Sequence, residues 1–157
     1  MGHVDDVTIT HESGRRLAVV HYESRPEDIG SKAGEAFRRV AAHLARTGMP
    51  IAGPAVSLFE ADEDAFSVTS GFVVESDVEP GEGVEPFRLP EVEVATTTHV
   101  GPYEELDKAY DVLGRGAAAH GRQVDDTGPM WEEYWSGPET PPAVTRTVVF
   151  RPLRPLH

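Results

Sequence analysis

The feature that most constrains the fold of this 157-residue chain is an internal repeat. The dipeptide Gly53-Pro54 recurs as Gly128-Pro129, an offset of 75 residues (128 − 53). Pro26 and Pro102 recur at nearly the same offset, 76 residues (102 − 26). A fixed offset between such residues indicates one structural unit that occurs twice. We therefore interpret the chain as two copies of one short plan.

The first copy is interpreted as strand, helix, strand, strand. Residues 15–22 (RRLAVVHY) are typical of a strand, and Pro26 with the two acids after it suits the first turn of a helix. An apolar stripe at helical spacing follows, made of Ile29, Ala33, Phe37, Val40 and Leu44. Residues 55–60 and 66–74 predict a hairpin, joined by the acidic turn at residues 61–65.

The second copy follows the same order. Residues 92–100 predict a strand, and Pro102, 76 residues after Pro26 (102 − 26), opens a helix. The apolar stripe of that helix is Leu106, Tyr110, Leu113 and Ala117. Residues 130–135 (MWEEYW) and 144–152 predict the closing hairpin, with a turn at residues 136–142.

These two copies predict an α+β fold in one domain, residues 1–157. Unit one spans about residues 5–75 and unit two about residues 91–153; the stretch between them, about 76–90, is rich in Pro, Gly and acid and is interpreted as a linker. One helix cannot cover the sheet of its own unit. We therefore predict one antiparallel sheet with both helices packed on one face and a central ligand groove.

The charge and the composition exclude several classes of function. A net charge of −13 disfavours direct binding of nucleic acid and favours cationic ligands or a basic protein partner. No apolar run is long enough for a membrane span and no signal peptide precedes the first strand, which predicts a cytoplasmic protein. The seven histidines lack metal-ligand spacing and no phosphate-binding glycine loop is present, so we expect no metal and no cofactor.

The stretch MWEEYW places two acids inside a strand with large aromatic side chains. Residues two apart in a strand share a face, so Glu132 lies with Met130 and Tyr134, whereas Glu133 lies with Trp131 and Trp135. Either group could line a pocket: Glu133 between two indoles would suit a cation cage, and Glu132 beside Tyr134 would suit a carboxylate held by a hydroxyl. Strand alternation by itself does not choose between them.

The second half of the chain resembles the GyrI-like domain, which is also the effector-binding domain of AraC-type and MerR-type multidrug regulators. The resemblance is carried over residues 92–153 by THVGPYEELDKAYDVL, then GPMWEEYWSGPETPP, then TRTVVFRPL. It implies a duplicated strand-helix-strand-strand fold and a central pocket for bulky aromatic or cationic molecules. The family's Glu-x-Tyr signature falls on Glu132 and Tyr134, which favours Glu132 as the acid of the pocket.

The resemblance and the residues together give three hypotheses about function. The first is a stand-alone small-molecule-binding protein, since the repeat begins too early in the chain to leave room for a helix-turn-helix. The second is a hydrolase of cyclopropane-bearing electrophiles, with Glu132 as general base and Tyr134 beside it. The third is an acidic module that binds a basic protein partner, such as a DNA-binding enzyme. The predicted ligand-binding residues are Glu132, Tyr134, Trp131, Trp135, Tyr103, Tyr110, Phe37 and Phe59.

Overall fold

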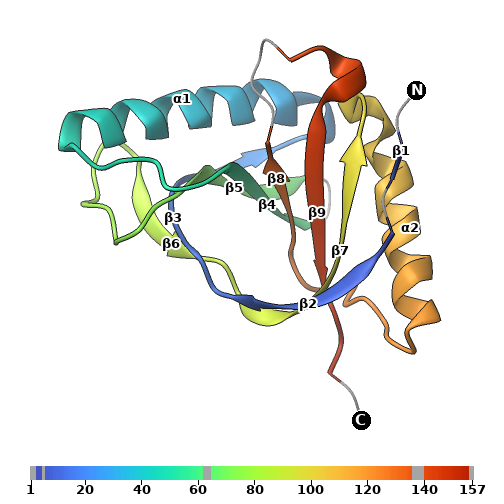
Figure 1. Cartoon of the computed structure of the whole chain (residues 1–157). Coiled ribbons are helices and arrows are strands. Elements are labelled where there is room, and N and C mark those ends of the chain that lie inside the picture. Colours follow the sequence, from blue (N-terminus) through green and yellow to red (C-terminus); the bar gives the residue numbers. More distant parts are fainter. Residues whose placement is uncertain (1–2, 5, 62–64, 136–139, 156–157) are drawn as a thin grey trace. The chain divides into compact units, whose positions relative to one another are not determined.

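Two strand-helix-strand-strand paths follow one another along the chain, and Figure 1 labels their elements. The computed structural model describes residues 3–4, 6–61, 65–135 and 140–155. Backbone contacts divide the chain into two compact units. We call Gly14–Pro90 the α1 unit, and we call Met1–Ser13 together with Glu91–His157 the α2 unit.

The α1 unit is a four-stranded antiparallel sheet with one helix on it. Its elements are β3 (Arg16–Ser24), η1 (Pro26–Asp28), α1 (Ile29–Thr47), β4 (Ala55–Ala61), β5 (Phe66–Val73) and β6 (Glu85–Arg88), and the strand order is β4-β5-β3-β6. Helix α1 packs on β3 and β5, where Val20, Val40 and Leu44 are buried in one apolar core. The helix ends at Gly48, whose φ of 71° is left-handed, as expected for a glycine after a helix.

The α2 unit repeats this plan around a second helix. Its elements are β1 (His3–Val4), β2 (Thr8–Ser13), β7 (Glu91–Val100), η2 (Tyr103–Glu105), α2 (Leu106–Ala119), β8 (Met130–Tyr134), η3 (Pro142–Val144) and β9 (Arg146–Pro152). The strand order is β7-β9-β8, and both β1 and β2 pair with the other edge of β7. Helix α2 lies along β7 (Figure 1), and its Leu113 packs against Ala95 and Val149 of the sheet.

The repeat is therefore present in the structure, and the predicted α+β class with duplicated units is confirmed. In each unit the last strand of the plan, β5 or β9, lies between the other two. The register also matches, because Ser57 pairs with Ser70 on β5 and Glu132 pairs with Val149 on β9. Ser57 is thus the counterpart of Glu132 at the predicted offset of 75 (132 − 57).

The structure adds strand pairings that the sequence did not suggest, among them those of β6 and β2. The predicted linker carries β6, whose Phe87 pairs with Leu17 of β3. Proline and acidic residues are depleted in strands, so the sequence of β6 did not predict one. Proline is nevertheless accepted on an edge strand. Strand β2, within the predicted first unit, pairs with β7 of the second. Residues 62–64 and 136–139, in the two predicted hairpin turns, lie outside the described residues.

Candidate functional site

Strand β8 directs Glu132 toward helix α2. Alternation along the strand puts Met130, Glu132 and Tyr134 on one face. Glu132 pairs across the sheet with Val149, which belongs to the apolar core beneath α2. The face that carries Glu132 is therefore the helix-covered face of the α2 unit, and only 8% of the residue is exposed.

Two tyrosine hydroxyls donate hydrogen bonds to the Glu132 carboxylate. Tyr110, from the middle of α2, donates to Oε2. Tyr134, two residues along β8, donates to Oε1 at 2.7 Å. Each carboxylate oxygen thus has one phenol donor, one from the helix and one from the strand. This arrangement suits an ionised carboxylate, which is an acceptor only.

Burial nevertheless dominates the electrostatics of this acid. Loss of hydration raises the pKa of Glu132 above its ordinary value of 4.5, although the hydrogen bonds from Tyr110 and Tyr134 act in the opposite direction. The pKa of Tyr110 is raised well above 10.0 by burial, and then by the charge of Glu132 and the hydrogen bond to it, against an opposing effect of Arg151. Glu132 therefore ionises less readily in the folded protein than a glutamate in water does.

Tyr103 completes the group on its solvent side. Its ring meets the ring of Tyr134 edge to face, with centroids 6.1 Å apart, and half of the residue is exposed. Burial first, and the charge of Glu132 second, raise the pKa of Tyr103. We call Glu132, Tyr110, Tyr134 and Tyr103 the Glu132 cluster. It combines one buried acid with three phenol rings, of which that of Tyr103 is the most exposed.

Glu133 is also buried, on the opposite face of β8. It is 5% exposed, and the indole Nε1 of Trp135 donates to its Oε1 at 3.3 Å. Trp131 is fully buried and stacks on Phe150, with ring centroids 5.5 Å apart and an angle of 14°. Trp135 is 56% exposed. The strand therefore holds two buried carboxylates, one among phenols and one beside an indole, and the prediction that either indole contacts a ligand stays a prediction.

The two predicted phenylalanines lie in the α1 unit. Phe37 of α1 contacts Phe72, with ring centroids 5.8 Å apart, and Phe59 of β4 contacts Phe66 at 6.3 Å. Both therefore take part in the packing of their own unit. Their role in a ligand site with the Glu132 cluster stays a prediction, as does the predicted groove.

A buried hydroxyl chain in the α1 unit escaped sequence reasoning. Ser57, the counterpart of Glu132, lies 2.8 Å from the Ser70 hydroxyl, and Ser70 lies 2.8 Å from the Tyr22 hydroxyl. Both serines are fully buried. The repeat offset could have found this site, because it maps residue 132 onto residue 57. The two units thus carry polar groups at matching places, one acidic and one neutral.

Other candidate sites are weaker. An open hollow of about 600 Å³ lies beside α2 and is lined by Asp6, Val7, Val112, Arg115, Gly116, Ala119 and His120. None of these residues belongs to the Glu132 cluster. In the described part of the chain, no three His, Asp or Glu side chains gather as a metal ion would require. No helix within that same part is long and apolar enough to span a membrane.

The raised pKa of Glu132 predicts a pH-dependent gain in stability for Glu132→Gln. Below about pH 4.5 the acid is protonated in the folded and unfolded chains alike; above it, the unfolded chain ionises first and stability is lost as the pH rises toward the folded pKa. Glutamine does not titrate. Thermal unfolding should therefore give the variant a higher Tm than the wild-type protein at pH 7.5, and a smaller gain at pH 4. The gain should be about 2 to 4 °C for each kcal/mol that the ionised Glu132 costs the folded wild-type protein. A Tm lowered equally at both pH values would contradict this account.

Comparisons with known proteins agree with the fold. The family model described as the GyrI-like small molecule binding domain matches residues 5–154. The fold is similar to the EcmrR C-terminal domain, with a TM-score of 0.81 and 15% identity over 96% of this chain and 98% of that chain. A hydrolase from Listeria innocua gives a TM-score of 0.72 and 17% identity over 95% and 92% of the two chains.

A third solved structure has been determined with a ligand. SAV2435 bound to tetraphenylphosphonium gives a TM-score of 0.63 and 7% identity over 96% of this chain and 94% of that chain. A search of curated proteins finds no match. The match of the family model to residues 5–154 covers nearly the whole sequence. This chain therefore belongs to the family of GyrI-like small-molecule-binding domains.

Proposed function

We propose that this protein binds bulky aromatic cations at the Glu132 cluster. The observation that carries the proposal is a buried carboxylate surrounded by phenol rings, one of them half exposed. An ionised carboxylate away from water is costly unless a positive charge lies near it. Membership in a small-molecule-binding family supports a ligand as the source of that charge.

The rings favour a delocalised cation over a compact one. An aromatic face attracts a desolvated cation by about 1–2 kcal/mol per contact, without demanding one orientation. A compact ammonium ion keeps its hydration more strongly than a large organic cation does. The tetraphenylphosphonium bound to SAV2435, a protein of similar fold, is a cation of this delocalised and aromatic class.

Tetraphenylphosphonium is therefore the first ligand to test, with triphenylphosphine oxide as its neutral relative. We expect Glu132→Gln to weaken binding of the cation about tenfold, which corresponds to one charge contact of roughly 1.4 kcal/mol. The affinity for the neutral compound should change less than about twofold. Binding of the cation should also strengthen as the pH rises through the raised pKa of Glu132, because the ligand selects the ionised acid. Titration calorimetry measures both effects.

Tyr22→Phe is the matched control for Tyr134→Phe. Tyr22 carries a hydrogen-bonded phenol in the α1 unit, whose partner is Ser70 and not Glu132. Tyr134→Phe removes a hydrogen bond that lowers the pKa of Glu132. Because less of the acid is then ionised, the variant should bind the cation more weakly near neutral pH. Equal loss of affinity for the charged and the neutral ligand, or equal effects of the two tyrosine variants, would contradict a role for the charge of Glu132.

A second candidate function is hydrolysis of an electrophile at the same acid. An acid with a raised pKa beside a phenol donor can act as a general base near neutral pH. Glu132 would take a proton from water, whose oxygen attacks a carbon of a cyclopropane conjugated to a carbonyl. The ring bond to that carbon breaks, and its electron pair moves to the carbonyl oxygen, which is protonated by Tyr134. The similar fold of a hydrolase from Listeria innocua supports testing this reaction.

Product analysis separates the hydrolase from a simple binder. If Glu132 is the base, a carbonyl-conjugated cyclopropane should open to the alcohol with the wild-type protein, and Glu132→Gln should slow this step at least 100-fold. Near-ultraviolet circular dichroism checks that the variant is folded. Turnover retained in Glu132→Gln would remove Glu132 from the mechanism. The alternative of a basic protein partner for the acidic surface stays a prediction.

A further inference from the structure

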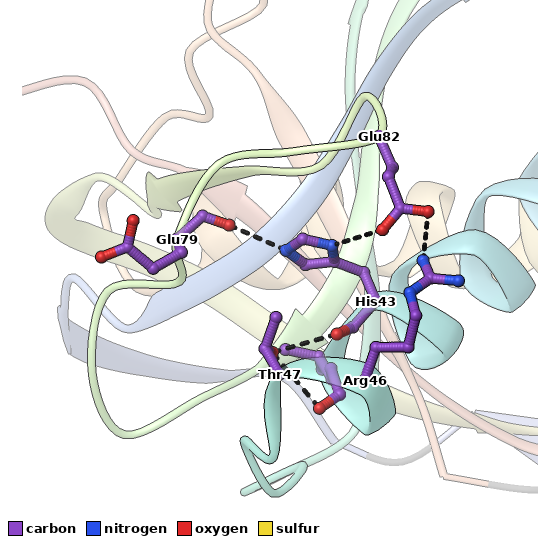
Figure 2. A network of polar contacts seen from close by, with 6 residues as sticks. His43, Arg46, Thr47, Glu79 and Glu82 are labelled. Carbon is purple, nitrogen blue, oxygen red and sulfur yellow. Dashed lines mark hydrogen bonds and ion pairs between the residues drawn. The ribbon is translucent and has the colours of Figure 1, made fainter.

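A second polar network lies at the end of α1, in the α1 unit, whereas the residues of the Glu132 cluster all belong to the α2 unit. Figure 2 shows His43 of α1 between Glu79 and Glu82, with Arg46 beside Glu82. His43 is 4% exposed. Its two acidic neighbours belong to the stretch Glu79-Pro80-Gly81-Glu82-Gly83, which we call the 79–83 loop. From the sequence, this loop was interpreted as part of the linker at about 76–90, and no role was predicted for His43.

Both ring nitrogens of His43 face acceptors. Nε2 lies 2.7 Å from the backbone carbonyl of Glu79, and Nδ1 lies 3.3 Å from Oε1 of Glu82. A carbonyl accepts only, so Nε2 carries a proton. An ionised carboxylate also accepts only, so the contact at Nδ1 is a hydrogen bond only when that nitrogen carries a proton too. The geometry therefore matches the doubly protonated imidazolium.

The acid in this contact is held in its ionised form. The hydrogen bond from His43, as the largest effect, lowers the pKa of Glu82, and Arg46 contributes to the same shift. Arg46 forms an ion pair with Oε2 of Glu82. Glu82 is thus the shared anion of two cationic side chains, which come from adjacent turns of α1. When the imidazole is neutral, its Nδ1 lone pair faces a carboxylate oxygen, and that arrangement is repulsive.

The 79–83 loop adopts an unusual backbone to reach the histidine. Glu82 has a φ of 57°, a left-handed conformation that non-glycine residues seldom adopt, and Gly83 follows with a φ of 82°. Gly81 lies against the imidazole, because a Cβ there would stand 3.2 Å from Cε1 of His43. Val78 and Val84, on either side of the loop, are buried in the core of the unit. The loop is therefore anchored at its base, and His43 and Arg46 both contact it at its tip.

We propose that His43 and Glu82 form a pH-responsive clasp that holds the 79–83 loop on the end of α1 when the imidazole is protonated. The sign of the effect follows from the contacts. The bond from Nδ1 to Glu82 is present while both ring nitrogens of His43 carry protons, and it is lost when Nδ1 gives up its proton at higher pH. The bond from Nε2 to the Glu79 carbonyl and the ion pair from Arg46 to Glu82 persist. The loop therefore loses one of these three contacts at its tip and keeps the other two, while its base stays anchored.

The charged groups around this imidazole act in opposite directions, and the nearest of them favours that sign. From the loop, Glu82 faces Nδ1; the carboxylate of Glu79 points away from the ring, and only its backbone carbonyl takes part (Figure 2). From α1, Arg46 reaches Glu82, and the guanidinium of Arg39 lies against Gly83 and pairs with Glu35 at 3.6 Å. The two arginines oppose protonation of His43, whereas Glu82, which is nearer, favours it.

A second histidine acts on the same stretch of chain. His21 of β3 places Nε2 2.7 Å from Oε1 of Glu85, the first residue of β6. Its Nδ1 lies 2.7 Å from the hydroxyl of Thr69, and its ring meets Phe87 of β6 edge to face. Since a hydroxyl can donate or accept, this contact is compatible with either charge state of His21.

Amide hydrogen exchange of the loop tests the clasp directly. The Gly81 N–H donates to the Val84 carbonyl at 3.0 Å, and the Val84 N–H donates to the Gly81 carbonyl at 2.8 Å. We expect the protection of these two amides, relative to unstructured peptide at the same pH, to fall about tenfold between pH 5.5 and 8. His43→Gln keeps a donor for the Glu79 carbonyl but cannot titrate, so its protection should be the same at both pH values.

Three further variants show which side chain causes the pH dependence of this amide protection. Glu82→Gln, at an exposed position, should also remove the pH dependence, because an amide can donate to the neutral imidazole. Glu79→Gln and His21→Gln should keep the tenfold fall, because neither changes a side chain that faces His43. Equal protection at both pH values in the wild-type protein would overturn the clasp, as would a tenfold fall retained in His43→Gln. If His43→Gln does not fold, Glu82→Gln decides the same question.

Discussion

The carboxylate of Glu132, held out of water between two phenol hydroxyls, is the interaction on which the proposed function depends. Tyr110 reaches it from α2 and Tyr134 from its own strand, so the helix and the sheet must both be in place for the acid to be satisfied. Burial still raises its pKa. The folded chain therefore retains an acid that ionises less readily than a glutamate in water, and such an acid can bind a ligand or take part in a reaction.

The two units have the same backbone plan, and they differ in a few polar side chains at matching places. The two units share strand order and register, yet the place of Glu132 is taken by Ser57 in the α1 unit. Ser57, Ser70 and Tyr22 satisfy one another as neutral hydroxyls. The residue 76 positions before Tyr110 is Gly34, so the first helix offers no matching phenol. Glu132 therefore gives the α2 unit a buried acid at a place where the α1 unit has a neutral serine.

Much of this structure could be predicted from local patterns, because the units are built from short-range signals. The offset of 75 identified the repeat, and strand alternation put Glu132 and Tyr134 on one face. The burial of Glu133 beside Trp135 could not be predicted, since alternation does not say what covers each face of a sheet. Strand β6 and the contacts of His43 were missed for another reason: they join residues 36 or more positions apart without any motif.

The most direct test of the account is a carbon-13 NMR titration of the Glu132 side-chain carboxyl, with and without tetraphenylphosphonium. The account predicts a midpoint above the ordinary glutamate value of 4.5 in the free protein, and a lower midpoint once the cation is bound, because the ligand stabilises the ionised acid. A midpoint at the ordinary value that the cation leaves unchanged would contradict the central claim that Glu132 is a buried, ligand-responsive acid.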